Sequence, residues 1–308
     1  MTSTAPTWPG RLIGVDALHR FAPAAGAVFE QLARTVAAPP EQVALVRRAC
    51  ADAHELRALL PPTGDGSGSV RATDQRILLR FAEQFSIDVS ALDDGLRAEL
   101  WTVLGQTPKQ ARGRLLAMMW VADLVPRVLT ALDRLFGAES RPLPGPDTAV
   151  DDATALAHDF VRVVHTLNGL DPILSDLIRL RGAHAHNCRL CKSLRSRSAL
   201  AAGATLDGFD GAGDLATSGL PAASKAALVL VDAVLWHPAR IDGDVLADVR
   251  THFTPAQAVE IVLDVMRNAW NKTTVAAELD EAHGTDGIEV YQYHDDGTVE
   301  FALDDPAR

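Results

Sequence analysis

The chain has little of several residue types, and each shortage excludes a class of protein. Only three of the 308 residues are cysteine. Three cysteines are too few for a disulfide scaffold, and their odd number favours a reducing compartment. Lysine and arginine number 29 against 40 aspartate and glutamate, which gives a net charge of −11. This acidic balance opposes a nucleic-acid partner or an anionic membrane surface.

Long apolar runs are also missing. The most apolar stretches, residues 115–125 and 226–236, are short and are interrupted by Asp123 and Asp232. Neither stretch by itself is long enough to cross a bilayer. The N-terminal MTSTAPTWPG lacks the basic segment and apolar core of a secretion signal. We therefore expect a cytoplasmic protein with no membrane partner.

Helical periodicity runs through most of the chain. The composition is that of a globular protein, with 47% hydrophobic and 22% charged residues. The one strand signal is a β-hairpin over residues 289–303, around an Asp-Gly turn at 296–297. The expected fold class is therefore all-α with a short C-terminal β-hairpin. Helices are predicted at 24–60 (two helices, the second over 41–60), 73–85, 91–104, 107–136, 151–167, 171–186, 221–236, 242–251 and from 254 onward.

Two helix-start signals indicate an internal repeat. Thr107-Pro108-Lys109-Gln110 and Thr254-Pro255-Ala256-Gln257 each combine an N-cap threonine, an N1 proline and a capping-box glutamine. In the 27 ungapped positions from each threonine to Asp133 and Asp280, ten residues are identical. The chain is thus predicted to be a tandem duplication. The expected units are an N-terminal repeat over 1–142 and a C-terminal repeat over 143–308, joined by the linker SRPLPGPD at 140–147.

Two of the three cysteines lie in residues 176–200, DLIRLRGAHAHNCRLCKSLRSRSAL, the segment around which we expect the rest of the chain to be arranged. The segment predicts a helix to about His186, an interruption at Asn187, and a second helix from about Cys188. Cys188 and Cys191 would then lie in a first turn, where unsatisfied N–H groups favour thiolate over thiol. Arg195, at i+7 from Cys188, would extend the same helix face as a positive charge.

Three interpretations of the Cys-x-x-Cys pair remain open. The favoured one is a dithiol/disulfide redox centre. A zinc site would use His184, His186, Cys188 and Cys191, but the spacing is unusually compact and no second ligand pair follows. The third is a pair of unreactive core cysteines, the interpretation given also to Cys50. A thioredoxin fold is excluded, because no strand pattern precedes the pair.

The segment resembles the alkyl hydroperoxidase D and carboxymuconolactone decarboxylase superfamily. Asp176 stands twelve residues before Cys188, where the peroxidase branch has glutamate, and Cys191 follows at the family spacing. Arg195 stands where the family usually has a histidine. Arginine can stabilise a thiolate but cannot relay a proton, so His184 or His186 would have to take that role. The segment Arg267–Lys272 is similar to the family's closing helix, while the N-terminal repeat resembles the family only as a degenerate copy.

The resemblance implies a thiol-dependent, antioxidant peroxidase or disulfide oxidoreductase without metal or organic cofactor. Cys191 would attack the peroxide, Cys188 would resolve the product to a disulfide, Asp176 would carry protons, Arg195 would stabilise the thiolate, and His186 could substitute as the relay. The implied partners are a small peroxide, an external thiol or dithiol reductant, and further copies of the chain in a homo-oligomer. The alternatives are a carboxymuconolactone decarboxylase-type lyase and a non-enzymatic redox-sensing protein.

In the degenerate copy, the repeat is expected to pair Glu41 with Asp176. Ala53 and Leu56 would then stand at the two cysteine positions. One half would carry the chemistry while the other packs against it.

Overall fold

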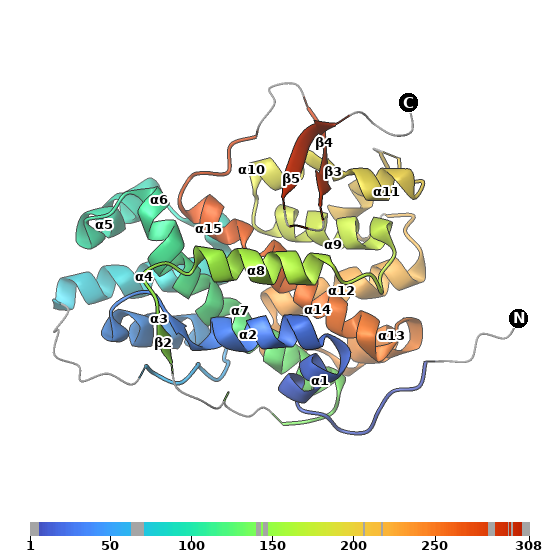
Figure 1. The fold of residues 1–308 in the computed structure, drawn as a ribbon, viewed down its shortest axis with the longest axis horizontal. Helices are drawn as coiled ribbons and strands as arrows, with labels where there is room; N and C mark the ends of the chain where they lie inside the picture. Colours follow the sequence, from blue (N-terminus) through green and yellow to red (C-terminus); the bar gives the residue numbers. More distant parts are fainter. Residues whose placement is uncertain are drawn as a thin grey trace, which may run out of the picture.

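The structure is a computed structural model that describes residues 6–62, 71–139, 143, 147–205, 207–216, 218–282, 287–294, 296 and 298–303. Most of these residues are helical, and a β-hairpin follows near the C-terminus (Figure 1). The all-α class and the hairpin are therefore confirmed. The sequence TGDGSGS at 63–69 is typical of a flexible loop. This segment, most of the linker at 140–147 and Gly297 of the predicted turn lie outside the described residues.

The N-terminal half contains seven α-helices among the described residues. Short 3-10 and π-helical turns, η1 at Val89–Ala91 and η2 at Arg112–Leu116, connect some of them. The helices are α1 Gly14–Phe21, α2 Pro23–Arg34, α3 Pro40–Asp52, α4 Ala72–Asp88, α5 Asp94–Leu104, α6 Pro108–Ala111 and α7 Ala117–Leu135.

The C-terminal half continues with helices α8 to α15. Two 3-10 turns, η3 at Asp207–Ala212 and η4 at Pro238–Arg240, lie between them. The helices are α8 Thr154–His165, α9 Pro172–Ala185, α10 Arg189–Lys192, α11 Arg197–Ala201, α12 Ala222–Trp236, α13 Gly243–His252, α14 Pro255–Asn268 and α15 Asn271–Ala276.

The strands are short and lie at the edges of the helical body. β1 Thr35–Val36 pairs in parallel with β2 Thr148–Ala149. β3 Leu194–Ser196 pairs in parallel with β4 Glu289–Tyr293, which pairs antiparallel with β5 Val299–Leu303. The hairpin therefore sits beside α10 and α11 (Figure 1). The sequence predicted β4 and β5 but not β3, because the partner of β3 is almost one hundred residues away in the chain.

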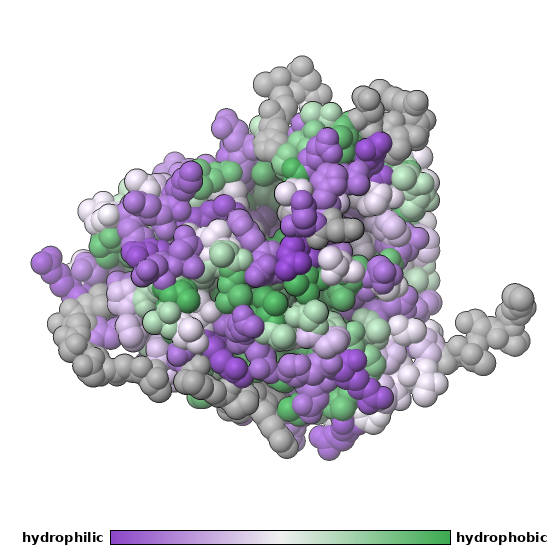
Figure 2. Space-filling model, in the orientation of Figure 1, coloured by the Kyte–Doolittle hydropathy of each residue, from purple (hydrophilic) through white to green (hydrophobic). Residues whose placement is uncertain are grey.

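Helices α7 and α14 pack against each other at the centre of one continuous hydrophobic core. Trp120 of α7 is fully buried, and its indole Nε1 donates to the Met266 carbonyl of α14 at 3.1 Å. Its ring also makes edge contacts with Trp270 and with Phe160 of α8. The two halves of the chain thus share a core. Figure 2 shows the outside of one face, where hydrophilic residues surround smaller apolar patches.

The helices of the two halves make corresponding contacts. In the first, α4 contacts α3, α5 and α7; in the second, α12 contacts α9, α13 and α14. The capping boxes of Thr107 and Thr254 both form, with the threonine and glutamine side chains each bonding the other residue's backbone N–H. A duplication would produce this arrangement, and the duplication itself stays a prediction.

The helix ends in the structure give a different alignment between the upstream parts of the two halves. Helices α3 and α9 begin at Pro40 and Pro172, and both chains then turn through a residue with positive φ, Glu55 and Asn187. Matching these ends pairs His54 with His186, an offset of 132 rather than the expected 135. The earlier pairing with Ala53 and Leu56 is therefore wrong, because it ignored where the helices end.

One further helix boundary differs from the expectation. Helix α3 ends at Asp52 rather than near Leu60, because the backbone turns at Glu55 with φ 55°. Pro126 lies inside α7 without ending it, and the continuous helical run from Pro108 to Leu135 spans 28 residues. By length and composition alone this run could cross a membrane. In the structure, 94% of its most apolar window is buried, as for a core helix.

The second capping box gives a stability prediction. In Thr254→Ala the backbone N–H of Gln257 loses its 3.3 Å bond to the threonine hydroxyl. We expect the free energy of unfolding to fall by about 1 kcal/mol. Chemical denaturation would measure the change, and Thr251→Ala, an exposed threonine in the preceding helix, is the control. An equal loss in both variants would contradict this role of the cap.

Candidate dithiol site

The cysteine pair lies just after the C-terminal end of α9. Asn187 has a φ of 51°, and the N–H of Cys188 donates back to the Ala183 carbonyl at 3.0 Å. This left-handed turn ends α9 and aims the chain into α10, with Cys188 at its N-cap. Asp280 fixes the start of α10 from another part of the chain: its carboxylate accepts from the Arg189 N–H at 2.9 Å, and its carbonyl accepts from the Leu190 N–H.

The predicted second helix is only one turn long, which corrects the position of Arg195. Helix α10 ends at Lys192, and Arg195 lies in β3 instead of on the same helix face as the cysteines. Its guanidinium donates to the carbonyls of Lys192 and Leu194 and lies 5.5 Å from the Phe209 ring centroid. Pairing with β4 holds this segment extended. Residues 203–218, whose glycine and aspartate content is typical of a loop, include η3, and Phe209 of that turn is buried.

Cys191 is the half-buried member of the pair, whereas Cys188 is fully buried. The Cys191 backbone N–H points to Cys188 Sγ at 3.4 Å, and Asn271 Nδ2 lies 3.7 Å from Cys191 Sγ. The hydrogen bond from Cys188, then the Arg179 charge and the Asn271 amide, lower the pKa of Cys191 to about 7 against the effect of burial. The same hydrogen bond between the two side chains, together with burial, raises the pKa of Cys188. One sulfur is therefore easily ionised and the other keeps its proton.

Arg179, not Arg195, supplies the positive charge next to Cys191. Its side chain is buried, with Nε 2.5 Å from Asp176 Oδ1. Its other nitrogens donate to the Cys191 carbonyl at 2.8 Å and to the Leu194 carbonyl at 2.7 Å. The ion pair with Asp176 thus lies inside the protein, and Arg179 holds the backbone at Cys191 and Leu194.

Asp176 lies in a different place from the one its predicted role requires. Besides Arg179, it accepts from the Ser196 backbone N–H at 3.2 Å and from the Tyr291 hydroxyl at 3.4 Å. No hydrogen bond joins it to either sulfur in the part of the chain that the structure describes. Because Arg179 separates Asp176 from Cys191, the geometry fits a positioning residue rather than the expected proton carrier.

The structure brings His186 close to the pair and leaves His184 exposed at the surface. His186 is buried, and its Nδ1 lies 2.8 Å from Asn271 Oδ1. Burial, followed by the charge of Lys272, lowers the pKa of His186 to about 3. The imidazole is therefore neutral at pH 7 and can orient the Asn271 amide toward Cys191. It carries no proton to give as an imidazolium.

A buried charged cluster lies behind His186 and joins the two halves. Asp123 of α7 accepts from Lys272 Nζ at 2.5 Å, from Ser86 Oγ at 2.6 Å and from Arg127 Nε at 2.8 Å. Arg127 also contacts His54, the residue that matches His186 when the ends of α3 and α9 are aligned. Although burial opposes ionisation, Arg127 and Lys272 lower the pKa of Asp123 to about 2.

The zinc alternative receives no support from the geometry. His184 is exposed whereas Cys188 is fully buried, and His186 is engaged by Asn271. Among the described residues, no group of three or more His, Cys, Asp or Glu side chains is placed to hold a metal ion. Cys50 lies in the hydrophobic core near the carbonyls of Ala82 and Met119, as expected for a core cysteine.

Sequence reasoning missed Asn271, Arg179 and Asp280 as parts of the site. Asn271 belongs to the segment Arg267–Lys272, which was noted only as a closing helix, and Asp280 was noted only as the end of the repeat. Asn271 lies 80 residues downstream of Cys191, and Asp280 lies 91 residues downstream of Arg189. The one sequence signal that could have indicated such a role was the polar residue Asp280 at the end of the predicted repeat.

The Asn271 contact gives a second prediction. In Asn271→Leu the Cys191 thiolate loses an N–H donor, and the pH midpoint of its alkylation by iodoacetamide is expected to rise from about 7 by about one unit. Asn268→Leu, on the preceding turn of the chain, is the control. If both variants kept the wild-type midpoint, Asn271 would not stabilise the thiolate.

The fold and the site define an all-α protein whose two halves share one core, with a cysteine pair in the C-terminal half. Over 288 residues the chain is 39% identical to Uncharacterized protein Rv2313c of Mycobacterium tuberculosis (strain ATCC 25618 / H37Rv), covering 91% of this chain and 99% of the relative. The same figures hold for Uncharacterized protein MT2376 of strain CDC 1551 / Oshkosh. The chain belongs to the family of these mycobacterial proteins. No protein-family model matches it, and no solved structure matches it.

Proposed function

We propose that the protein is a thiol-dependent peroxidase, or disulfide oxidoreductase, that reduces small hydroperoxides. The observation that carries the proposal is the unequal environment of the two sulfurs. Cys191 is half-buried and ionises near pH 7, while Cys188 is buried beside it and retains its proton. A nucleophilic thiolate next to a protonated partner thiol is what a two-cysteine peroxide cycle requires.

The cycle has two steps on the protein. The Cys191 thiolate attacks the outer oxygen of a hydroperoxide ROOH, the O–O bond breaks, and Cys191 sulfenic acid and RO⁻ form. RO⁻ takes a proton from solvent and leaves as the alcohol. The sulfur of Cys188 then attacks the Cys191 sulfur and displaces hydroxide, which takes the Cys188 proton and leaves as water. An external dithiol reduces the disulfide and is itself oxidised.

The surrounding residues position this pair. Arg179 holds the Cys191 carbonyl and adds positive charge near the sulfur, and Asp176 fixes Arg179. Asn271 points its amide at Cys191, and His186 orients that amide. Arg195 braces the backbone after α10. No metal or organic cofactor takes part in the cycle as proposed.

The same proposal makes the chain a divergent member of the alkyl hydroperoxidase D and carboxymuconolactone decarboxylase superfamily. It would act as a cytoplasmic antioxidant enzyme, with one thiol-bearing repeat and one degenerate repeat, and would associate into homo-oligomers. The positively charged and hydrogen-bonding setting of Cys191 is what supports this proposal over the decarboxylase alternative, which needs no redox thiols.

Single-equivalent oxidation tests the proposal. Reduced wild-type protein treated with one equivalent of cumene hydroperoxide should lose two hydrogens in mass and carry a Cys188–Cys191 disulfide. Cys188→Ser should stop at a sulfenic acid on Cys191 that dimedone traps, and Cys191→Ser should form neither product. Oxidation confined to Cys50, or none at equimolar peroxide, would overturn the assignment and leave the redox-sensor or lyase alternative.

A further inference from the structure

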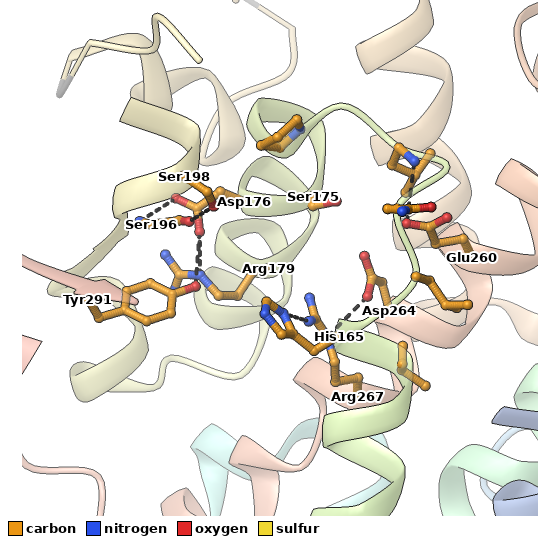
Figure 3. A pocket seen from close by; sticks show the side chains of 15 residues that line it. His165, Ser175, Asp176, Arg179, Ser196, Ser198, Glu260, Asp264, Arg267 and Tyr291 are labelled. Carbon is orange, nitrogen blue, oxygen red and sulfur yellow. Dashed lines mark hydrogen bonds and ion pairs between the residues drawn. The ribbon is translucent and has the colours of Figure 1, made fainter. Parts of the chain in front are cut away.

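A cavity of about 190 Å³ lies between α8, α9, α14 and β4. Neither Cys188 nor Cys191 lines it. Asp176, Arg179, Ser196, Ser198 and Tyr291 form one side, and Figure 3 shows Glu260 and Asp264 facing them from across the space.

Asp264 is the unusual group in this cavity. The residue is 2% exposed, and its side chain points into the space in Figure 3. Arg267 Nε lies 3.0 Å from its Oδ1, but the geometry is not that of a hydrogen bond. No other described residue donates a hydrogen bond to this carboxylate, although buried carboxylates normally have several donors.

The nearby charges leave Asp264 incompletely neutralised. Arg267 is shared, because its Nη1 also lies 3.1 Å from His165 Nδ1. Glu260, one turn before Asp264 on α14, accepts from the backbone N–H groups of Gly169 and Leu170 at 2.9 and 3.3 Å. Asp176 is paired with Arg179. When all three carboxylates are ionised they face two guanidinium groups, those of Arg179 and Arg267, and the cavity is then short of one positive charge.

The rest of the lining is mostly apolar, with Asn168 and Ser175 as its polar members, and the space is small. Val164, Leu167, Leu170 and Pro172 line it. A cavity of about 150 Å³ accepts a molecule the size of benzene, so this one has room for a ring or short chain of about six carbons. Its lining therefore offers an apolar surface for hydrocarbon and a carboxylate pair for a cation.

We propose that this cavity is a binding site for a small primary amine, whose ammonium group is held by Asp264 and Glu260 and whose hydrocarbon part lies on the apolar wall. The ammonium group supplies the missing positive charge and the missing donors. Serine hydroxyls on the opposite side can accept or donate to a further polar group. The site is separate from the dithiol and does not depend on peroxidase activity.

The affinity depends on pH in a defined direction. Burial, reinforced by the nearby Glu260 charge and opposed by Arg267, raises the pKa of Asp264 to about 7. An ammonium ion binds the ionised carboxylate, so a proton must leave first at lower pH. Affinity should rise about tenfold from pH 6 to pH 8. The charged or titratable groups that face Asp264 are Glu260 and Arg267 of α14, His165 of α8, Asp176 and Arg179 of α9, and Tyr291 of β4.

Calorimetric titration with cyclohexylammonium at pH 8 tests the site, with cyclohexanol and cyclohexanecarboxylate as ligands of nearly the same shape. We expect the ammonium ion to bind at least tenfold more tightly than either. Asp264→Asn should remove that preference, while Asp159→Asn, on the exposed side of α8, should keep it. Asp264→Asn removes a buried charge and is expected to stay folded, and its unfolding transition checks this.

The other outcomes are equally decisive. Equal affinity for the amine and the alcohol, or an unchanged preference in folded Asp264→Asn, would overturn the proposal. Cys191→Ser should bind the amine as the wild type does, so a failure of the peroxidase assignment and a failure of this site can be told apart.

Discussion

Asp123→Asn is expected to lower the free energy of unfolding by about 3–5 kcal/mol, because it leaves two buried cations without their counter-ion. Asp123 is 1% exposed and is the common acceptor for Arg127 and Lys272, which is itself 3% exposed. Burial lowers the pKa of Lys272, so the protein retains this charge only because Asp123 and the neighbouring acceptors offset its desolvation. Removal of the carboxylate charge should loosen the contact between α7 and the segment that begins α15.

Urea denaturation at pH 7 would measure this loss, with Asp159→Asn as the control for removing one exposed aspartate. The folded-state pKa of Asp123, about 2, is below its ordinary value of 3.8. The stabilisation is therefore present above pH 4 and is lost as the pH falls toward 2. A loss below 1 kcal/mol at pH 7 in Asp123→Asn would show that the ion pair does not hold the halves together.

Acidification from pH 6.5 to pH 4 is expected to destabilise the protein steeply through its buried histidines. The pKa of His186 is lowered to about 3 by burial and Lys272, and that of His54 to about 4 by burial and Arg127. The unfolded chain binds these protons near pH 6.5 but the folded chain does not. Each group then contributes a slope of up to about 1.4 kcal/mol per pH unit, and partly solvated His54 contributes less.

In His186→Phe, unfolding should take up close to one proton fewer, so the unfolding free energy should depend less steeply on pH. This expectation holds even if the variant is less stable at pH 7. The quantity to measure is the change of unfolding free energy between pH 6.5 and pH 4.5. His252→Phe, at an exposed position in α13, is the control. An unchanged slope in His186→Phe would mean that the imidazole is protonated in the folded state, and the orientation of Asn271 would need another explanation.

The sequence was sufficient where structure is set locally. Both capping boxes, most helices and the C-terminal hairpin follow from spacing and from turn residues within a few positions. Helix ends set by a residue with positive φ, such as Glu55, were missed because glutamate rarely takes that conformation. For the same reason, the predicted offset between the two halves upstream of the cysteines differs by three residues from the offset that the helix ends give.

The site was only partly predictable because its decisive contacts are distant in sequence. Cys188 and Cys191 were found from their spacing, but β3 depends on β4, which is almost one hundred residues downstream. That pairing ends the cysteine helix after one turn and removes Arg195 from its expected face. Asp123 interrupts an apolar run in the sequence, and nothing local indicates that Lys272, 149 residues away, neutralises it.

The central claim is that Cys191 and Cys188 form a catalytic dithiol, and hydroperoxide turnover tests it most directly. Metal-free wild-type protein, Cys50→Ser and Cys191→Ser would each be supplied with cumene hydroperoxide and an excess of dihydrolipoamide. We predict continuous peroxide consumption by the wild type and by Cys50→Ser, and a rate at least about 1,000-fold lower in Cys191→Ser, since the nucleophile is lost. Consumption by Cys191→Ser at the wild-type rate, or no consumption by the wild type, would contradict the claim.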